Sequence, residues 1–395
     1  MRVIVTGGGS GGHITPVLAV AAELKKLDQH VEVEYVIQTG DALADVPAQD
    51  PHIDHVYGIR AGKFRRYHGE GLKQLLDLPT MYKNVRDAMF VCIGFWQSLW
   101  LLRRLRPDVI FIKGGYVGVP VGLAAAFLRI PYVTHDSDAM PGLANRIIAR
   151  WARLHAVALP KEVYKYAQNK TVTVGVPISA RFHPVSAEAR AQTCRRLQIP
   201  PEGPVVVITG GGLGARRINN AVLACASQLF ARYPDLQLLH IAGRQEESAV
   251  RTAYRQELSP KFRDHVVVKG FVANLYDYSA VASVVVTRAG GTTMAEMAAQ
   301  AKACVVVPAP HLAGGHQLKN AHILAQRKAI CVVDESTLAD DPLALMPALT
   351  NLLDNPAKLA SLGKKLSQLA QPDAAHRLAV LLLKVATTSS GPKKT

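Results

Sequence analysis

The feature that most limits the fold of this chain is a strand, glycine turn and helix pattern that occurs twice. The first copy, RVIVTGGGSGGHITPVLAVAA, begins at residue 2, and the second, PVVVITGGGLGARRINNAV, begins at residue 204. In each copy an apolar run leads into closely spaced glycines and then into a helical pattern. A turn of this kind places backbone amides at a helix N-terminus, where they favour an anion. The repeat therefore predicts two α/β halves, each opening with its own anion-binding turn.

Further apolar strands alternate with helical patterns along nearly the whole chain. In the first half they lie at 31–38, 108–113, 131–135, 154–159 and 171–176, and in the second at 236–243, 265–271, 283–288, 303–308 and 329–334. Continuous apolar strands separated by helices are typical of parallel sheets covered on both faces. The sequence therefore predicts the fold class α/β, with two Rossmann-like, doubly wound parallel-sheet domains facing a cleft.

We expect the first domain to span 1–178 and the second 179–384, with a polar, proline-containing linker near 178–203. The last helix could cross back to the first domain, and the tail over 385–395 should be disordered. Met1 and Arg2 lead straight into a strand, which argues against a signal peptide. The five cysteines have no paired spacing, so we expect neither a zinc site nor a disulfide framework, as fits a reducing cytoplasm.

The net charge of +16 points to an anionic partner, and part of it is concentrated between residues 60 and 106. That window holds ten Lys and Arg residues but only three Asp and Glu, interleaved with Trp, Phe and Leu. This mixture favours a helix lying in an anionic membrane interface, although core-packed helices with a solvated basic face remain an alternative. Its greasiest stretch, 89–102, has 14 residues, too few to span a bilayer. No nucleic-acid recognition motif appears, so we expect no nucleic-acid partner.

The first glycine turn alone does not identify its ligand. Gly7, Gly9 and Gly12 satisfy the dinucleotide fingerprint, but Gln38 stands where a ribose-binding Asp or Glu should end the second strand. A dehydrogenase also needs only one such turn. These two observations argue against hydride transfer from a nicotinamide cofactor.

Four more stretches follow strands and precede helices, which is where open α/β sheets bind ligands: KGGYVGVP, HDSDAMPGLANR, TRAGGTTMAEM and APHLAGGHQLKNA. With the two glycine turns, these stretches resemble, in order, the patterns GGTGGHxxP, GGYxSxP, HEQNxxPGLxN, GGSQGA, RxGxxTxxE and DxHQxxNA of the MurG family. The resemblance covers residues 3 to about 383. It implies the two-domain GT-B fold and transfer of N-acetylglucosamine from UDP-N-acetylglucosamine to the undecaprenyl-linked muramyl pentapeptide called lipid I, which gives lipid II of peptidoglycan.

The resemblance also implies site residues. His13 is the implied catalytic residue, and the implied acceptor-binding residues are Tyr116, His135 and Asn145. The implied donor-binding residues are Ser10, Gly11, Gly12, Asp138, Arg181, Gly212, Val272, Arg288, Gly290, Gly291, Thr292, Thr293, Glu296, His316, Gln317 and Asn320. Among these, Glu296 matches the ribose ligand, and Gln317 and Asn320 match residues that face the donor sugar. The family needs no metal or cofactor.

Five departures from the family patterns leave the choice of sugar and acceptor open. Asp136, Ser137 and Asp138 replace Glu, Gln and Asn, and Gly212 and Leu213 replace Ser and Gln. Ser179, or Arg181 two residues on, stands where the family has an arginine, and Gly314-Gly315 replaces an acidic position. The basic region near 63–100 is also longer than expected.

Each implied role has a plainer alternative. The Asp-Ser-Asp triplet at 136–138 could grip Mn²⁺ or Mg²⁺, although spaced aspartates after strands are commonly caps. Glu296 could be half of a capping box with Thr293, while Gln317 and Asn320 could merely cap a helix. Tyr116 could cover the end of the sheet, and His13 could be a neutral imidazole bonded at a helix start.

The sequence thus favours an inverting, metal-independent transfer in which His13 assists deprotonation of the muramyl C4 hydroxyl. The expected partners are UDP-N-acetylglucosamine, lipid I and an anionic membrane surface, and the expected location is the cytoplasmic face of the membrane, as a peripheral protein. One alternative is a UDP-N-acetylglucosamine 2-epimerase or another GT-B glycosyltransferase. Another is a degenerate nucleotide-sugar-binding scaffold.

Overall fold

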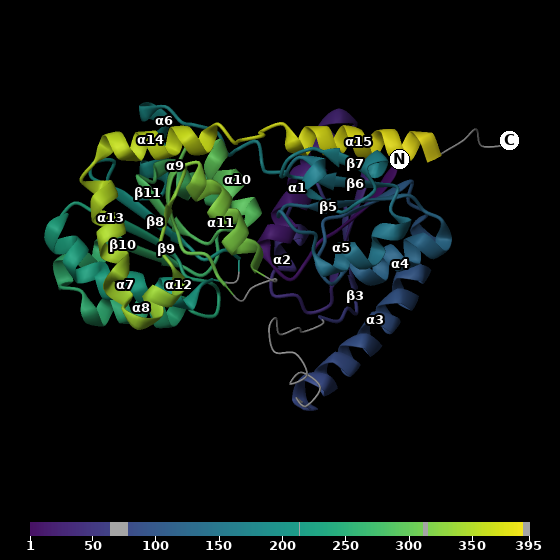
Figure 1. Ribbon diagram of the computed structural model, residues 1–395, viewed down its shortest axis with the longest axis horizontal. Coiled ribbons are helices and arrows are strands. Elements are labelled where there is room, and N and C mark those ends of the chain that lie inside the picture. The colour runs from purple at the N-terminus through teal and green to yellow at the C-terminus, as the bar shows by residue number, and fades with distance from the viewer. Residues whose placement is uncertain (64–77, 213, 311–314, 390–395) are drawn as a thin grey trace. The chain divides into compact units, whose positions relative to one another are not determined.

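The computed structural model describes residues 1–63, 78–212, 214–310 and 315–389, omitting the side chains of 78–81 and 389. The chain divides into two compact units, one formed by Met1–Ser179 with the segment from Pro372 onward, and the other by Ala180–Gln371. Residues 372–384, which the sequence analysis placed in the second domain with a last helix that could cross back, belong to the first unit, so the last helix does cross back. Figure 1 labels many of the elements of both units.

In the first unit, the described residues form a seven-stranded parallel sheet in the order β3-β2-β1-β4-β5-β6-β7. The strands are β1 (Arg2–Thr6), β2 (Glu32–Gln38), β3 (His55–Ile59), β4 (Val109–Ile112), β5 (Tyr132–Asp136), β6 (Leu154–Val157) and β7 (Thr171–Thr173). The helices are α1 (Gly11–Leu27), α2 (Asp45–Ala48), α3 (Leu78–Leu105), α4 (Gly118–Leu128), α5 (Leu143–Ile148) and α15 (Ala374–Ser389), with 3₁₀ turns at Ala149–Trp151, Lys161–Val163 and Gln168–Lys170.

In the second unit, the described residues form a six-stranded parallel sheet in the order β10-β9-β8-β11-β12-β13. The strands are β8 (Val205–Thr209), β9 (Gln237–Ile241), β10 (Val266–Lys269), β11 (Val284–Thr287), β12 (Ala303–Val306) and β13 (Cys331–Val332). The helices are α6 (Ala187–Arg196), α7 (Arg216–Arg232), α8 (Glu247–Glu257), α9 (Leu275–Val281), α10 (Gly291–Ala299), α11 (His316–Gln326), α12 (Glu335–Asp340), α13 (Leu345–Leu353) and α14 (Pro356–Ser367), with 3₁₀ turns at Pro260–His265 and Pro342–Ala344.

The central strands are buried along their whole length. Every residue of β4, β8, β11 and β12 is buried, as expected for parallel strands with helices on both faces. The two α/β halves with parallel sheets are therefore confirmed.

The last helix, α15, packs against the first helix, α1, and is not part of a disordered tail. In Figure 1, α15 is the yellow helix that lies along α1, and His376 Nδ1 lies 3.0 Å from Glu23 Oε2. Val385 and Ala386 are buried, at 4% and 1% exposure. The expectation of disorder from residue 385 is wrong up to residue 389, because apolar side chains continue the buried face of the helix; residues 390–395 lie outside the described part.

Two other sequence expectations also fail locally. The expected linker near 178–203 contains α6, whose Ser186 accepts a capping hydrogen bond from Ala189 N at 3.2 Å. Strand β3 was missed because HVYGI is short and only partly buried.

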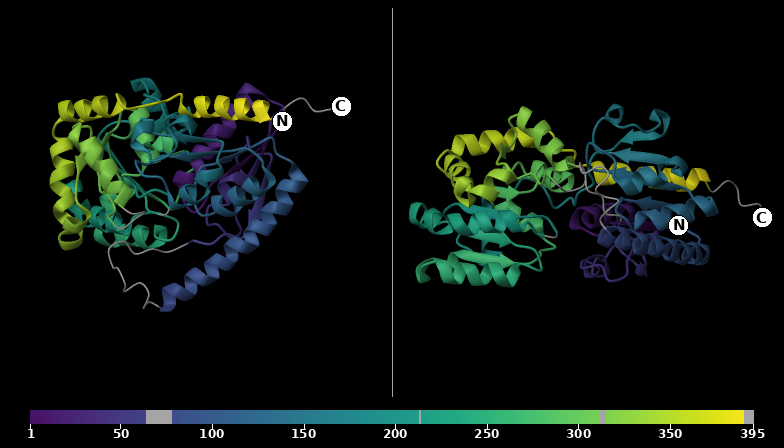
Figure 2. Two further views of the ribbon diagram at one scale, coloured as in Figure 1. Left: turned by 45° about the vertical axis from the view of Figure 1, so that its right-hand side comes forward. Right: turned by 60° about the horizontal axis from the view of Figure 1, so that its bottom comes forward.

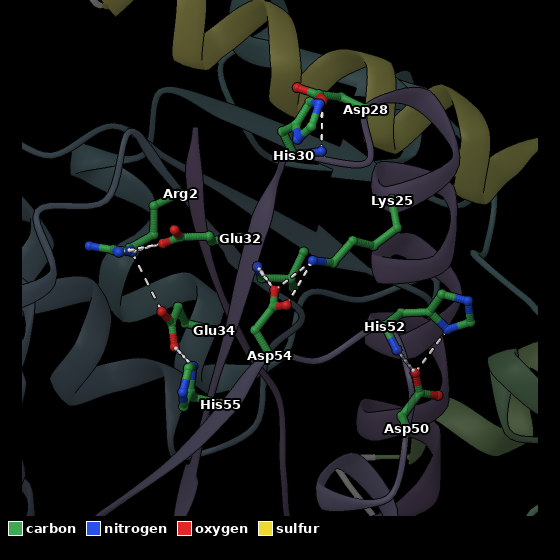
Figure 3. Close-up of polar contacts among 11 residues, drawn as sticks. Arg2, Lys25, Asp28, His30, Glu32, Glu34, Asp50, His52, Asp54 and His55 are labelled. Carbon is green, nitrogen blue, oxygen red and sulfur yellow. Dashed lines mark hydrogen bonds and ion pairs between the residues drawn. The ribbon is translucent and has the colours of Figure 1, made fainter.

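A group of charged side chains lies at the amino ends of β1, β2 and β3 (Figure 3). Arg2 pairs with Glu32 and lies 3.5 Å from Glu34, which lies 3.5 Å from His55. Ligands in open parallel sheets bind at the opposite, carboxyl edge. We therefore interpret this group as a support for strand pairing, not as a site.

Candidate functional site

Residues from three neighbouring strands of the first unit meet at the carboxyl edge of its sheet. His13 follows the glycine turn after β1, Tyr116 follows β4, and His135 lies near the end of β5. Because β1, β4 and β5 are adjacent, their carboxyl ends lie side by side. A side-chain carbon placed on Gly114 would lie 3.5 Å from Asn145 Nδ2 and 3.7 Å from His13 Cε1. The structure thus brings His13, Asn145 and the turn after β4 together.

Tyr116 covers the first glycine turn. A side-chain carbon on Gly9, whose φ is +80°, would lie 2.7 Å from Tyr116 Cε1. Burial, with smaller contributions from Asp41 and Asp87, raises the pKa of Tyr116 to about 12. The tyrosine is therefore a neutral hydroxyl at physiological pH, and its close packing requires glycine at position 9.

The first glycine turn already holds an internal carboxylate. Gly9 N donates to Asp41 Oδ2 at 2.7 Å, while Ser10, the N-cap of α1, makes no side-chain capping bond. Asp41 lies in the turn after β2, three residues beyond Gln38, and sequence reasoning missed it. A carboxylate at this amide repels a second anion there. Ser10, Gly11 and Gly12 are expected to lie close to the donor diphosphate. This role remains a prediction, and it requires backbone amides of the turn other than that of Gly9.

The imidazoles of His13 and His135 are neutral at physiological pH. Burial, followed by the positive charge of Lys113, lowers the pKa of His13 to about 4, with Asp138 opposing the shift. Burial and Lys113 likewise hold the pKa of His135 well below its ordinary value. His135 Nε2 lies 2.8 Å from the carbonyl oxygen of Gly175, which can only accept, so that nitrogen carries the proton. An unprotonated nitrogen thus remains on each ring.

Lys113, which the sequence analysis did not single out, lies near His13 and His135 and affects their pKa values. It ends the apolar run of β4 and is only 3% exposed. Burial lowers its pKa, and the carboxylates of Asp138 and Asp136 act in the opposite direction. The run DVIFIK, in which a lysine directly follows the apolar residues of the strand, is the sequence signal from which Lys113 could have been identified.

Four buried polar atoms in this region have no hydrogen-bond partner among the residues that the structure describes: His13 Nδ1, His135 Nδ1, Ser137 Oγ and Asn145 Oδ1. We call His13, His135, Ser137 and Asn145 the His13 cluster. In folded proteins nearly all buried polar atoms have a hydrogen-bond partner. A cluster of buried polar atoms without partners therefore indicates a place that binds polar groups from outside the chain. The His13 cluster is the candidate site of the first unit.

In the second unit, a carboxyl group is buried in the middle of a short helix. Helix α10 begins at Gly291, after the N-cap Gly290, and its Glu296 is 5% exposed. Burial alone raises the pKa of Glu296 to about 8. A capping box needs the acid at the third helical position, whereas Glu296 is the sixth residue, so the capping alternative is excluded. Among the described residues no charged group contributes to this shift. A buried carboxyl group with so strongly raised a pKa is a functional-site candidate.

Arg288, at the end of β11, is already engaged within its own unit. Its guanidinium forms an ion pair with Glu335 of α12, and Nη1 donates to the Val307 carbonyl oxygen at 3.1 Å. The two side chains are 11% and 9% exposed. Glu335 was missed in the sequence because nothing local marks an acid 47 residues away as its partner.

The two amides of α11 hold neighbouring loops. Gln317 Oε1 accepts from Ala309 N at 3.0 Å, and Asn320 Nδ2 donates to the Ala289 carbonyl oxygen at 3.0 Å. These hydrogen bonds tether the loops that follow β12 and β11, so both side chains have a structural role. The donor-sugar contacts expected for both residues remain predictions, as does that of His316, which begins the helix after Gly315 at φ +78°.

Most of the remaining donor-side residues lie on separate loops and helices of the second unit. Arg181 bonds Tyr276 and stacks on its ring at 5.1 Å. Val272 follows Phe271, on whose ring Arg244 stacks at 5.1 Å. Gly212 lies in the turn before α7, while Thr292 and Thr293 lie in the first turn of α10. Leu213 and Gly314, two of the departures from the family patterns, lie outside the described residues.

The described residues contain no group of three or more His, Cys, Asp or Glu side chains arranged to hold a metal ion. Asp136 instead accepts hydrogen bonds from Gly142 N at 3.1 Å, Asn145 Nδ2 at 3.0 Å and Tyr166 OH at 2.8 Å. Because three donors already surround the Asp136 carboxylate, we interpret it as a hydrogen-bond acceptor that holds its neighbours in place and not as a metal ligand.

A long helix of the first unit carries an exposed apolar stripe. Helix α3, the long blue helix of Figure 2, has 28 residues, twice the length of the greasy stretch on which the sequence estimate was based. Its segment Tyr82–Leu105 is long and apolar enough to cross a membrane by length and composition, so that estimate is corrected. One face packs inward, with buried residues Leu99, Leu101, Leu102 and Leu105.

The opposite face of α3 is open. Its large exposed side chains recur at helical intervals, as Tyr82, Val85, Met89, Ile93, Trp96 and Trp100, and the two tryptophans are 67% and 63% exposed. We call these six residues the α3 stripe. Arg104 stacks on Trp100 at 5.4 Å, and Arg103 is exposed beside it. Residues 64–77 of the basic window, with Arg65, Arg66 and Lys73, lie outside the described part.

Comparisons with known proteins agree along the whole chain. The glycosyltransferase family 28 N-terminal domain matches residues 3–157, and the C-terminal domain of the same family matches residues 205–378. A relative from Moorella thermoacetica is 32% identical over 99% of this chain and 100% of its own. Its name is UDP-N-acetylglucosamine–N-acetylmuramyl-(pentapeptide) pyrophosphoryl-undecaprenol N-acetylglucosamine transferase. A relative of the same name from Halalkalibacterium halodurans is 31% identical over 98% of this chain and 100% of its own.

Solved structures share the fold. MurG from Acinetobacter baumannii has a TM-score of 0.65 at 23% identity, covering 97% of this chain and 99% of that one. A UDP-GlcNAc 2-epimerase from Neisseria meningitidis, bound to UDP-GlcNAc, has a TM-score of 0.66 at 13% identity, covering 97% and 100%. At these identities the likeness shows the fold alone, and both a transferase and an epimerase have that fold.

Proposed function

The chain belongs to the MurG family within glycosyltransferase family 28, and from this premise we propose that it transfers N-acetylglucosamine from UDP-N-acetylglucosamine to the muramyl sugar of lipid I. The product is lipid II, the precursor of peptidoglycan. The two relatives are named for this reaction, and each is matched over its full length.

The proposed chemistry is an in-line displacement with inversion at the anomeric carbon. The muramyl C4 hydroxyl attacks that carbon while a neutral His13 accepts its proton. The bond to UDP breaks, and the negative charge that develops on UDP is stabilised by amides at the N-termini of α7 and α10. Arg288 would contribute positive charge, reduced by its pairing with Glu335.

The observation that carries the proposal for the first unit is the His13 cluster. A low pKa keeps the His13 imidazole unprotonated, so a ring nitrogen is available to accept a proton, and unsatisfied polar atoms lie in the same cluster. A sugar acceptor supplies several hydroxyl groups that can satisfy such atoms. For this reason we assign the acceptor to the first unit and the donor nucleotide to the second, where Glu296 lies.

Labelled UDP-N-acetylglucosamine, incubated with and without lipid I, tests the assignment. A transferase labels lipid only when lipid I is present. An epimerase converts the free nucleotide sugar without lipid, and a nucleotide-sugar-binding scaffold does neither. Conversion in the absence of lipid I would overturn the transferase assignment.

Metal independence is a prediction of the same proposal. Addition of a chelator should leave the initial rate unchanged, since helix amides and Arg288 stabilise the leaving group. The initial rate of lipid labelling, measured with EDTA and with added Mg²⁺ or Mn²⁺, checks this expectation. Loss of the rate in EDTA and its return on titration with Mn²⁺ would make Asp136 and Asp138 metal ligands.

We also propose that the protein binds the cytoplasmic face of the membrane peripherally, through the α3 stripe and the arginines at the end of α3. Lipid I carries a polyprenyl chain that stays in the bilayer, so its catalyst must work at the surface. Exposed tryptophans beside arginines suit an anionic interface, where each Lys or Arg contributes about 1 kcal/mol. Helix α3 also packs against α4 on its other face, as suits a helix that lies on the membrane.

Vesicle sedimentation should show this binding. The protein should pellet with phosphatidylglycerol vesicles, less with neutral ones, and less at high salt. Reversing the charges of Arg103, Arg104 and Arg106 should weaken binding about a hundredfold or more, because about 3 kcal/mol of attraction is removed.

A matched control reverses three exposed cations of the second unit, Arg255, Arg327 and Lys364, and should leave binding unchanged. Equal and negligible binding to both kinds of vesicle would mean that the α3 stripe does not contact lipid. Resistance to alkaline extraction from natural membranes would instead indicate that α3 crosses the bilayer.

A further inference from the structure

Asn145 is held in the first unit by two hydrogen bonds from the same atom. The residue lies in α5 and is 1% exposed. Its Nδ2 donates to the carbonyl oxygen of His135 at 2.9 Å and to Asp136 Oδ1 at 3.0 Å. Both partners are oxygens that accept.

These partners fix which end of the amide faces which way. If the side chain were reversed, Asn145 Oδ1 would face two oxygens and both hydrogen bonds would be replaced by repulsion. Oδ1 must therefore point away from Asp136, and it is buried without a partner among the described residues. Oδ1 lies 3.6 Å from the position that a side-chain carbon on Gly114 would take, and His13 Cε1 lies 3.7 Å from that same position.

Asp136 is itself fixed by a tyrosine. Its Oδ2 accepts from Tyr166 OH at 2.8 Å, and the carboxylate is 5% exposed. The ring of Tyr166 stacks on His155 at 4.0 Å, and His155 Nδ1 lies 2.8 Å from Thr134 Oγ1 in β5. Tyr166 therefore has a defined position from which to hold the carboxylate.

We propose that Asp136, held by Tyr166, is a positioning residue that presents Asn145 Oδ1, within the His13 cluster, as a hydrogen-bond acceptor for the substrate. The group bound there must be a donor, either a hydroxyl or an amide N–H of the acceptor sugar. A phosphate or carbonyl oxygen would meet a lone pair and be disfavoured. The identity of the substrate rests on the proposed function, whereas the direction of the hydrogen bond rests on the network itself.

Two tyrosine variants test the proposal. Tyr166→Phe removes one hydrogen bond to Asp136 and keeps the ring stack. The matched control is Tyr164→Phe, whose ring lies parallel at 6.4 Å and whose hydroxyl donates to the Asp138 carbonyl oxygen at 3.0 Å, not to Asp136. We expect Tyr166→Phe to raise the KM for lipid I about three- to tenfold, as fits one lost hydrogen bond, with kcat and the donor KM within about twofold. Tyr164→Phe should leave all three values within about twofold.

A double variant separates positioning from general support of the fold. In an Asn145→Ala background Tyr166→Phe should have no further effect on the KM for lipid I, because the atom that it positions is gone. An undiminished effect there, or equal KM values for Tyr166→Phe and Tyr164→Phe, would overturn the inference. Absence of transfer by the unmodified protein would overturn the proposed function and, with it, the identity of the bound substrate.

Discussion

Replacement of His13 by alanine is expected to lower the turnover number about 10²- to 10⁴-fold, which is the usual contribution of a general base. UDP affinity should stay within a few-fold, because Glu296 and the glycine turn of α7 lie in the other unit. Single-turnover transfer to lipid I and calorimetry with UDP measure the two quantities separately. A loss that appears in donor affinity instead would make His13 a phosphate-binding or structural residue.

The pH dependence gives His13 a second signature. A base must be unprotonated, so activity should fall as the pH drops through the His13 pKa of about 4. Lys113 contributes to that low value, and Lys113→Met should therefore raise the pKa and move the acidic limb of kcat/KM to higher pH. An acidic limb that does not move in Lys113→Met would mean that another group is being titrated.

The sequence predicted the sheets well because their strands are long apolar runs with no competing interpretation. Strand β8, for example, is VVVIT and is buried throughout. Strand β3 lies at the edge of its sheet and α6 is a polar surface helix, so neither has a strong apolar pattern. The length of helix α3 was underestimated because polar residues on both sides of its apolar centre interrupt the run of hydrophobic residues.

The site was predicted only where one segment carries its own signal. The glycine turns, His13 and Glu296 stand in recognisable local patterns, and the structure places the turns and His13 at a carboxyl edge or helix start and Glu296 inside α10. Asp41 and Glu335 act on residues 32 and 47 positions away, respectively. Such pairings depend on which strands and helices become neighbours, and local spacing does not contain that information.

The second large effect is expected at Glu296. Glu296→Ala should raise the dissociation constant of UDP about 10- to 100-fold, equivalent to about 1.5–3 kcal/mol, by removing an acceptor for the ribose hydroxyls. Glu296→Gln is the matched control for shape, and it should lose most of the same affinity because the charge is gone. Unchanged UDP affinity by calorimetry in both variants would make Glu296 a core residue of α10.

The proton on Glu296 makes this prediction sharper. With a pKa of about 8, the carboxyl group is mostly protonated at pH 7 in the free protein, whereas two ribose hydroxyl donors favour the ionised form. UDP binding should therefore release a proton, and the binding enthalpy at pH 7 should depend on the ionisation enthalpy of the buffer. In Glu296→Gln that dependence should disappear.

Stability provides an independent measurement on the same variant. A carboxyl group whose pKa is raised on folding binds more protons in the folded state, so its contribution to stability is lost as the pH rises from about 4.5 to about 8. Free Glu296→Gln should consequently unfold at a higher temperature than the unmodified protein at pH 8, and the difference should shrink towards pH 5. A variant that is more stable alone yet binds UDP less tightly would show that the buried carboxylate serves ligand binding at the expense of the fold.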